Sequence, residues 1–442
     1  MRFLYLLFWF VYKVAFRLYF RRLVVSTNSP YFYGRTIFIS NHPGSLMDPL
    51  LIGSARRPIV FFMTRSDVFT ALTKPLLWAV HMLPIYRQRD GVDTKTKNAS
   101  IFEKTNHVLK SKRNILIFGE GFTDDKTPRH LFPIKKGALR IGFSALEFME
   151  WKRDVFVQGL GINYMDPQVR RSDVVIKSGE PIRLNDFRAV YEENPNKALS
   201  EITRLIEKDM RSLLTDIHDL DWCEFHEQTM MLTRKGMNGS CYDANLTVEH
   251  RLEYSMKLAG FLNHASDHQK EQLEPLKIKM GDYFNALSQL GITENALFHA
   301  HVEKRRNQWL PIKLILLTPI FCLGLLHTAL PYLWVKRFVE KALKRPVFWP
   351  GTKVTMAFFV VLLFNLPLVF WLLPKLLFLV DFPPVFWLVY FILIAPISML
   401  FLFVIDTYKA WFLRRQIKAM DLSSLLEMRS QLLEQLNKRI PL

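Results

Sequence analysis

Two long uncharged runs near the C-terminus limit what this chain can fold into. Val354–Leu373 and Val385–Ile405 contain no Asp, Glu, Lys or Arg. As an α-helix each run is about 30 Å long, which is the thickness of the hydrocarbon core of a bilayer. A third apolar run, Leu314–Val335, is interrupted by three residues: Pro319, His327 and Pro331. The sequence therefore predicts an α-helical transmembrane region over residues 309–406.

The charge balance agrees with a membrane setting. The 442 residues include 59 Lys and Arg against 40 Asp and Glu, a formal net charge of +19, together with 36 Phe. A basic chain this rich in Phe indicates anionic membrane phospholipid as a partner and argues against nucleic acid. No feature of the sequence indicates an oligomeric state.

Basic clusters around the apolar runs bear on topology. They begin at Lys304, Lys336 and Lys409, and the positive-inside rule assigns all three to the cytoplasm. Two crossings satisfy that rule if Leu314–Val335 dips into the bilayer without crossing, whereas three crossings leave one cluster outside. We favour two crossings and an integral membrane protein whose remaining domains lie on the cytoplasmic face.

The N-terminus, residues 1–30, has the pattern of an amphipathic helix in the membrane interface. Lys13, Arg17 and Arg21 recur every four residues and form one basic stripe. We expect the remaining, lipid-facing side to carry five apolar residues: Phe8, Trp9, Val11, Phe16 and Phe20.

Residues 31–190 alternate between strand-like and helical patterns, which predicts a mixed α/β sheet covered by helices. The expected strands are Thr36–Ser40, Ile59–Met63, Ile115–Phe118, Val155–Leu160 and Val174–Ile176. The expected helices are Ser45–Ser54, Thr94–Ser111 and Lys135–Met149. A helical region over 191–308 follows, and residues 407–442 end the chain in an amphipathic helix.

His42 and Asp48 are the candidate catalytic residues in this α/β region. His42 follows the first expected strand and precedes Pro43-Gly44, so it lies on a strand-to-helix turn. Imidazole accepts a proton near neutral pH, and a nearby carboxylate fixes its tautomer. Taken alone, the pair is equally well read as a turn histidine followed by an aspartate at a helix start.

Three further motifs decide between these interpretations. In chain order the four motifs are Asn41-His42…Asp48, Leu83–Arg89, Phe118–Thr123 with Pro133–Ala138, and Val155–Tyr164. This series resembles the four blocks of the glycerol-phosphate and lysophospholipid acyltransferase superfamily, the 1-acylglycerol-3-phosphate acyltransferases among them. The layout of the whole chain resembles the branch of that superfamily with C-terminal membrane segments.

The resemblance implies a mechanism and a set of site residues. His42 would be the general base that deprotonates the acceptor hydroxyl, and Asp48 would orient it. No cofactor or metal is implied, because an acyl thioester, acyl-CoA or acyl carrier protein, is the donor substrate. The acceptor would be glycerol 3-phosphate or lysophosphatidate. For acceptor and phosphate binding, Arg87, Glu120 and Gly121 match the family's second and third blocks, and we add Arg89 and Lys135 as further candidates.

Backbone N–H groups around Gly119–Gly121 are our candidates for stabilising the developing oxyanion. The family's third block carries an arginine that Phe122-Thr123 lack here. Its replacement is one of four cations: Lys126, Arg129, Lys135 or Lys136. Five residues also separate His42 from Asp48 where the family commonly has four.

Other interpretations stay open at this point. Arg87 and Arg89 are also consistent with surface charges, and Glu120 with a turn cap. Another lysolipid or an amino-acid lipid would serve as acceptor in the same chemistry. A catalytically silent lipid-binding or transport protein is the alternative from a different class, with His327 as the one ionisable residue inside an apolar run.

Overall fold

A computed structural model describes residues 2–26, 32, 34–55, 60–71, 73–86, 94–125, 129–303, 312, 315–376 and 383–440. The chain divides into two compact units. The first comprises Met1–Cys223, Lys235–Gly239 and Ala244–His264. The second comprises Glu224–Arg234, Ser240–Asp243 and Ala265–Leu442. The domain boundaries expected from the sequence stay predictions.

A mixed sheet forms the centre of the first unit. Its strands are β1 (Arg22–Val25), β2 (Thr36–Ser40), β3 (Val60–Arg65), β4 (Met82–Ile85), β5 (Asn114–Phe118), β6 (Phe156–Tyr164), β7 (Asp173–Ser178) and β8 (Ile182–Arg183). The order is β1-β7-β6-β2-β5-β3-β4, with β8 beside β6. Only β6 with β7 and β6 with β8 pair antiparallel. The predicted mixed α/β sheet is confirmed.

The middle of this sheet is what positions the site. Strand β2 is buried along its whole length and pairs in parallel with both β5 and β6. Its last residue, Ser40, lies opposite Phe118 of β5 and Leu160 of β6. The carboxyl ends of β2 and β5 therefore lie at one edge of the sheet, and the segments that follow them meet there. The last residues of the longer β6 reach the same edge.

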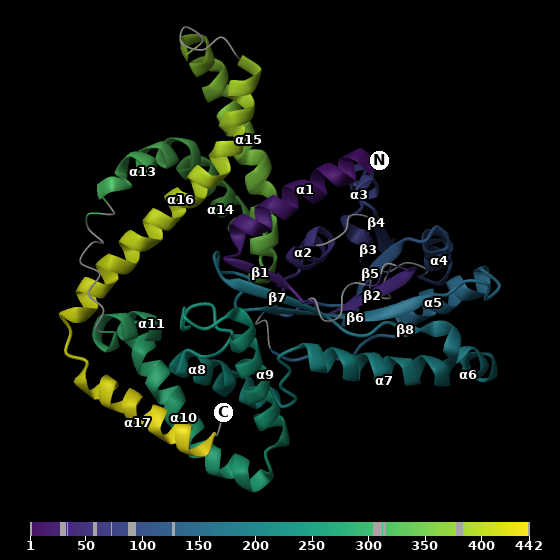
Figure 1. Ribbon diagram of the computed structural model, residues 1–442, viewed down its shortest axis with the longest axis horizontal. Coiled ribbons are helices and arrows are strands. Elements are labelled where there is room, and N and C mark those ends of the chain that lie inside the picture. The colour runs from purple at the N-terminus through teal and green to yellow at the C-terminus, as the bar shows by residue number, and fades with distance from the viewer. Residues whose placement is uncertain are drawn as a thin grey trace. The chain divides into compact units, whose positions relative to one another are not determined.

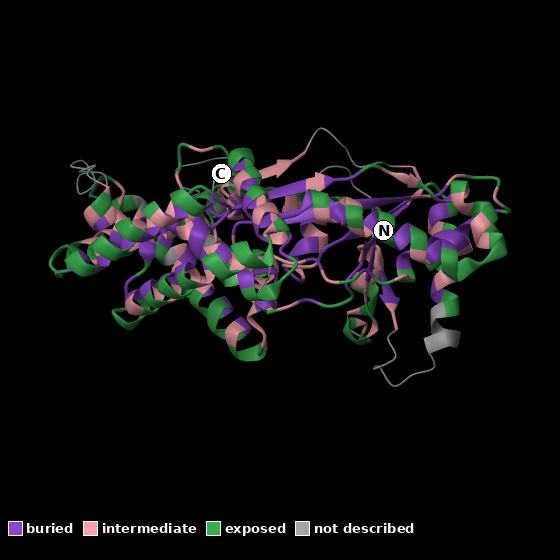
Figure 2. Cartoon of the chain, turned by 90° about the horizontal axis from the view of Figure 1, so that it is seen from below, coloured by how far each residue is buried: buried purple, intermediate pink, exposed green. Residues whose placement is uncertain are grey.

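Helices cover both faces of the sheet, as Figure 1 shows. In the first unit they are α1 (Arg2–Tyr19), α2 (Met47–Ala55), α3 (Lys74–Ala79), α4 (Thr94–Lys110), α5 (Gly137–Phe148), α6 (Arg188–Glu193), α7 (Pro195–Leu213) and α9 (Val248–His264). Ile37 and Ile39 of β2 join one apolar core with residues of α4, α5 and α7. Phe38 points to the opposite face, because side chains alternate along a strand, and it is also fully buried. Buried residues accordingly follow the strands in Figure 2.

Helix α1 differs from the sequence-based expectation in the face that it exposes. Phe16 and Phe20 are buried, and Phe20 stacks on Tyr164 at 5.8 Å. The prediction that these two rings face lipid is therefore wrong. The exposed apolar residues form a different stripe: Phe3, Leu6, Leu7, Phe10 and Val14.

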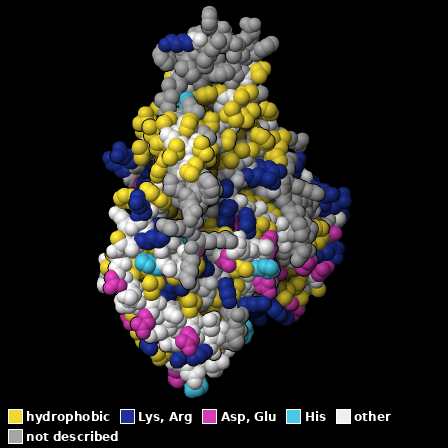
Figure 3. All heavy atoms as spheres, turned by 60° about the vertical axis from the view of Figure 1, so that its left-hand side comes forward, with side chains coloured by type: hydrophobic (Ala, Val, Ile, Leu, Met, Phe, Trp, Pro, Cys, Tyr) yellow, Lys and Arg dark blue, Asp and Glu magenta, His cyan; other side chains and the backbone are white. Residues whose placement is uncertain are grey.

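The second unit is helical. It contains most of α8 (Cys223–Thr233), followed by α10 (Asp267–Gln289), α11 (Glu294–Leu297), α13 (Thr318–Gly324), the π-helix η6 (Leu325–Ala329), α14 (Leu330–Ala342), α15 (Trp349–Leu376), α16 (Pro383–Lys418) and α17 (Ser423–Arg439). Two stretches are long and apolar enough to cross a bilayer, Pro346–Pro367 and Ile392–Lys418. Figure 3 shows hydrophobic side chains gathered over the part of the molecule that holds these helices.

Candidate active site

His42 and Asp48 lie together at the carboxyl edge of the sheet. His42 follows β2, and its Nδ1 is 2.9 Å from Asp48 Oδ2. The imidazole stacks on the ring of Phe118 with 3.9 Å between centroids. The Asp48 side chain is fully buried, whereas 19% of the His42 side chain is exposed. A histidine held at Nδ1 and reachable from solvent is arranged to accept a proton at Nε2.

A tight turn brings the two side chains together. The Gly44 N–H donates to Asp48 Oδ2 at 2.8 Å, and the Asp48 N–H donates to the carbonyl of Ser45. Ser45 has a φ of 53°, so the chain reverses here before α2 begins at Met47. A Cβ added at Gly44 would lie 2.6 Å from Asp48 Oδ1, which explains why glycine occupies this position. The turn accommodates the five residues between His42 and Asp48.

A third side chain completes this group. The Tyr164 hydroxyl, at the end of β6, donates to Asp48 Oδ1 at 2.8 Å. Sequence reasoning named Tyr164 only as the end of the fourth motif and gave it no role. No local signal identifies it, because 116 residues separate it from Asp48 and the strand order alone joins them.

Glu120 follows β5 and is 6% exposed. Its carboxylate accepts hydrogen bonds from the backbone N–H groups of His42 and Phe132. Burial, with a smaller contribution from the nearby Asp48 charge, raises the pKa of Glu120 from 4.5 to about 8. Glu120 therefore ties the His42 turn to the 129–136 segment, a contact that the sequence does not predict.

The backbone amides proposed for the oxyanion have other partners. The Gly119 N–H donates to the Ser40 carbonyl at 3.1 Å, and the Gly121 N–H donates to the Phe118 carbonyl at 3.2 Å. Our expectation that these two amides are available to a developing oxyanion is therefore wrong.

The cations predicted to bind phosphate differ in whether the structure places them beside the site or gives them partners elsewhere. Lys136 Nζ donates to Ser200 Oγ at 2.7 Å, on α7. Arg129 donates to backbone carbonyls, among them those of Tyr164 and Met165. Lys135 is exposed, and its ammonium lies against Gly121. A Cβ added at Gly121 would be 2.7 Å from Lys135 Nζ. Three predicted cations lie outside the described residues: Arg87, Arg89 and Lys126.

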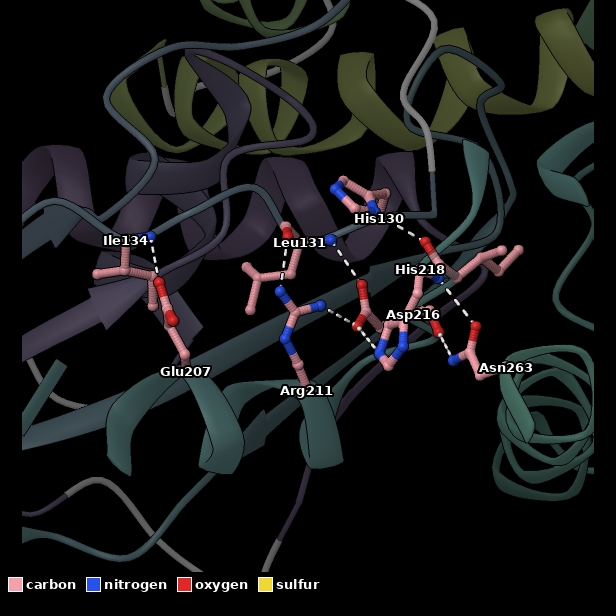
Figure 4. Close-up of polar contacts among 9 residues, drawn as sticks. His130, Leu131, Ile134, Glu207, Arg211, Asp216, His218 and Asn263 are labelled. Carbon is pink, nitrogen blue, oxygen red and sulfur yellow. Dashed lines mark hydrogen bonds and ion pairs between the residues drawn. The ribbon is translucent and has the colours of Figure 1, made fainter. Parts of the chain in front are cut away.

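The segment that carries Lys135 is firmly held, as Figure 4 shows. The Leu131 N–H donates to Asp216 Oδ1 at 2.7 Å, and Arg211 bonds both the Asp216 carboxylate and the Leu131 carbonyl. The Ile134 N–H donates to Glu207 Oε1 at 2.7 Å. Helix α7 and the chain after it thus fix the segment from both ends, and with it the Phe132 N–H that reaches Glu120.

Comparison with known proteins finds an acyltransferase match for part of the chain. Residues 22–159 match the sequence model of the Acyltransferase family. No curated protein matches the chain significantly in sequence. The crystal structure of the 1-acyl-sn-glycerophosphate (LPA) acyltransferase PlsC from Thermotoga maritima is similar at 19% identity and a TM-score of 0.31, covering 45% of this chain and 77% of that chain. The resemblance drawn from the sequence is confirmed at the level of the domain: residues 22–159 are an acyltransferase domain.

Proposed function

We propose that this protein transfers a fatty acyl group from a thioester donor, acyl-CoA or acyl carrier protein, to the hydroxyl of lysophosphatidate or glycerol 3-phosphate. The observation that carries the proposal is the bond between His42 Nδ1 and the buried Asp48 carboxylate within the acyltransferase domain. With Nδ1–H held by Asp48, the free Nε2 removes the proton of the acceptor hydroxyl.

The chemistry is a direct transfer. The acceptor oxygen attacks the thioester carbonyl carbon, a C–O bond forms and the C–S bond breaks. The proton passes from the hydroxyl to His42 Nε2 and then to the departing thiolate. Asp48 stabilises the imidazolium that exists between these two proton transfers. No nucleophilic side chain of the protein is acylated.

Lys135 is our candidate for holding the acceptor phosphate. Of the third-motif cations that the structure describes, Lys136 and Arg129 have partners elsewhere, and Lys135 lies beside Gly121. An exposed ammonium suits phosphate as a point charge. Arg87 and Arg89 follow β4, which ends at the same edge of the sheet, and we keep them as further candidates.

We also propose that the domain works at the cytoplasmic surface of a membrane. The exposed stripe of α1 follows helical periodicity, with Phe3, Leu7, Phe10 and Val14 on one face. Lys13 lies next to this stripe and is suited to anionic headgroups. This arrangement supports an interfacial position for α1 with a lipid-facing side other than the one first expected.

The contacts of α13 and α14 support two crossings with a re-entrant segment between residues 318 and 342. At its apex His327 bonds Asn365, about 24 Å along α15 from its start. From that apex α14 returns along α15, since Glu340 pairs with Lys353 at 2.7 Å.

The other arm of the segment descends along α16. The ring centroids of Phe321 and Phe401 are 5.3 Å apart. Phe401 comes after Tyr390 along α16, and Tyr390 is the residue of that helix that bonds His327. Both arms thus lead toward the start of α15 and the end of α16, which supports the same side of the membrane for both. This topology keeps the three basic clusters on one face, as the positive-inside rule requires.

Transfer from a labelled donor tests the proposed function. Full-length protein in phospholipid vesicles is given acyl-CoA or acyl carrier protein and a panel of acceptors: lysophosphatidate, glycerol 3-phosphate, other lysophospholipids and phosphate-free monoacylglycerol. We expect transfer to a phosphate-bearing acceptor. The absence of transfer to every acceptor from either donor would contradict the proposal and favour a silent lipid-binding protein.

Lys135→Ala and its control Lys136→Ala test whether Lys135 binds the acceptor phosphate. We expect Lys135→Ala to raise the KM for the phosphate acceptor about tenfold, because a charged partner is lost. Lys136→Ala keeps the wild-type KM, since its ammonium bonds Ser200. An equal effect of the two changes would remove the assigned role of Lys135.

A further inference from the structure

Tyr164 is a buried hydroxyl placed against the carboxylate that orients His42. It is 4% exposed and donates to Asp48 Oδ1 at 2.8 Å. Among the described residues, this is the one hydrogen bond between β6 and the carboxylate, whereas His42 and Gly44 both belong to the turn after β2. Tyr164 therefore connects the His42–Asp48 pair to a second strand of the sheet.

The three donors divide the two oxygens of Asp48 between them. The His42 ring and the Gly44 N–H share Oδ2, and Tyr164 binds Oδ1. A carboxylate held on one oxygen alone rotates about its Cβ–Cγ bond, since that torsion is soft. With Oδ1 anchored, Oδ2 stays in the plane that the imidazole needs.

The phenol ring is itself fixed. Phe20 stacks against it at 5.8 Å, and Arg129 Nη1 donates to the backbone carbonyl of Tyr164 at 3.2 Å. Burial, together with the adjacent Asp48, raises the pKa of Tyr164 well above its usual value. The hydroxyl therefore keeps its proton and acts as a donor over the whole working pH range.

We propose that Tyr164 is a positioning residue of the acyl transfer, whose hydroxyl fixes the Asp48 carboxylate so that Oδ2 holds His42 Nδ1–H and Nε2 faces the acceptor. This inference rests on the proposed function. Tyr164 touches neither substrate, so its loss affects turnover and leaves substrate binding intact. Two other titratable groups described near the pair are Glu120, whose carboxyl group is bound by backbone N–H groups, and Tyr19, which lies close to Tyr164.

The test is Tyr164→Phe, which keeps the ring and removes one oxygen. We expect kcat to fall about 10- to 100-fold, the range for a buried hydrogen bond to a charged group, with KM for donor and acceptor unchanged. Without the phenol, Asp48 attracts the imidazole proton more strongly. The acid limb of the pH–rate profile therefore moves to higher pH, a change that a purely structural role would not cause.

Tyr5→Phe is the matched control. It removes the hydroxyl of another buried tyrosine in the same unit. This hydroxyl accepts from the Val60 N–H at 2.9 Å, at the opposite end of the strands from Ser40 and Phe118. We expect wild-type kcat and an unmoved acid limb. Circular dichroism and thermal melting of both variants exclude misfolding as the cause of any loss.

A double-mutant cycle with Asp48→Asn separates positioning from general stability. If Tyr164 acts through Asp48, adding Tyr164→Phe to Asp48→Asn changes kcat less than twofold. The inference would be overturned if the effects of the two changes on kcat were fully additive, or if Tyr164→Phe had the wild-type kcat and pH profile. The proposed function would still stand in either case, because the wild-type protein would transfer the acyl group. Absence of transfer by the wild-type protein would instead contradict the proposed function.

Discussion

The two units each contain a hydrogen-bonded group built from a histidine, a tyrosine and one further, buried polar side chain. In the first unit the third member is a carboxylate, Asp48, at 2.9 Å from His42. In the second it is an amide, Asn365, at 2.7 Å from His327. Tyr164 bonds only the carboxylate, whereas Tyr390 bonds both His327 and Asn365. The third member also differs in charge.

The charge of the third side chain decides whether the histidine can act as a base or only makes a packing contact. An anionic partner stabilises an imidazolium, so the His42 group can take up a proton during a reaction. An amide offers no such charge. His327 of η6 is hydrogen-bonded to Asn365 of α15 and Tyr390 of α16. Inside a membrane such polar contacts hold helices together, typically by about 1 kcal/mol each. The transport role considered for His327 gains no support from these contacts.

Asp48→Asn makes the first group resemble the second and is expected to have the largest effect. The amide keeps the shape but removes the charge and favours the wrong imidazole tautomer. We expect kcat to fall about 10³-fold, with little change in KM. The measurement is steady-state transfer at saturating donor. A loss below tenfold would show that the charge of Asp48 is not what distinguishes the two groups.

Gly44→Ala tests the turn that joins the pair. The added Cβ would lie 2.6 Å from Asp48 Oδ1 and 3.1 Å from the Tyr164 ring, both rigidly held. We expect turnover to fall about tenfold or more and unfolding free energy to fall by about 1–3 kcal/mol. Gly260→Ala on α9, where an added Cβ would meet no atom within 4 Å, is the control and should match or exceed wild-type stability. Equal behaviour of the two alanines would contradict the described turn.

The central strands and the His42–Asp48 pair were predictable because their signals are local. Strand β2 was predicted to the residue, since Thr36–Ser40 is a short apolar run bounded by turn residues. Strand β4 was missed because Pro84 argues against a strand, and β4 tolerates it as an edge strand. Tyr164 and the Glu120 contacts were not predictable, because each depends on which strands the fold places side by side. The lipid-facing side of α1 was assigned wrongly because the protein core itself takes up Phe16 and Phe20.

Glu120→Gln tests the buried carboxylate through stability. The folded state retains a proton up to about pH 8 that the unfolded chain releases near 4.5. Stability therefore falls as pH rises through this window, by up to about 1.4 kcal/mol per pH unit. The amide is neutral throughout, so we expect the melting temperature of Glu120→Gln in detergent to fall less between pH 5 and pH 8. Glu103→Gln, an exposed change on α4, should keep the wild-type slope, and an unchanged slope in Glu120→Gln would contradict the assignment.

Asn365→Leu tests the second group and is expected to have the smallest effect on catalysis. It removes the bonds to His327 and Tyr390. We expect thermal stability in detergent to fall by about 1–2 kcal/mol and kcat per folded molecule to stay at the wild-type value. A loss of turnover comparable to that of Asp48→Asn would mean that the two groups do not differ in function.

The most direct test compares His42→Ala with His327→Ala in vesicles, using acyl transfer from a labelled thioester to lysophosphatidate or glycerol 3-phosphate. We predict that His42→Ala lowers transfer at least about 10³-fold while the protein stays membrane-bound and folded. His327→Ala should keep wild-type turnover. Wild-type transfer by His42→Ala would contradict the assignment of His42 as the base.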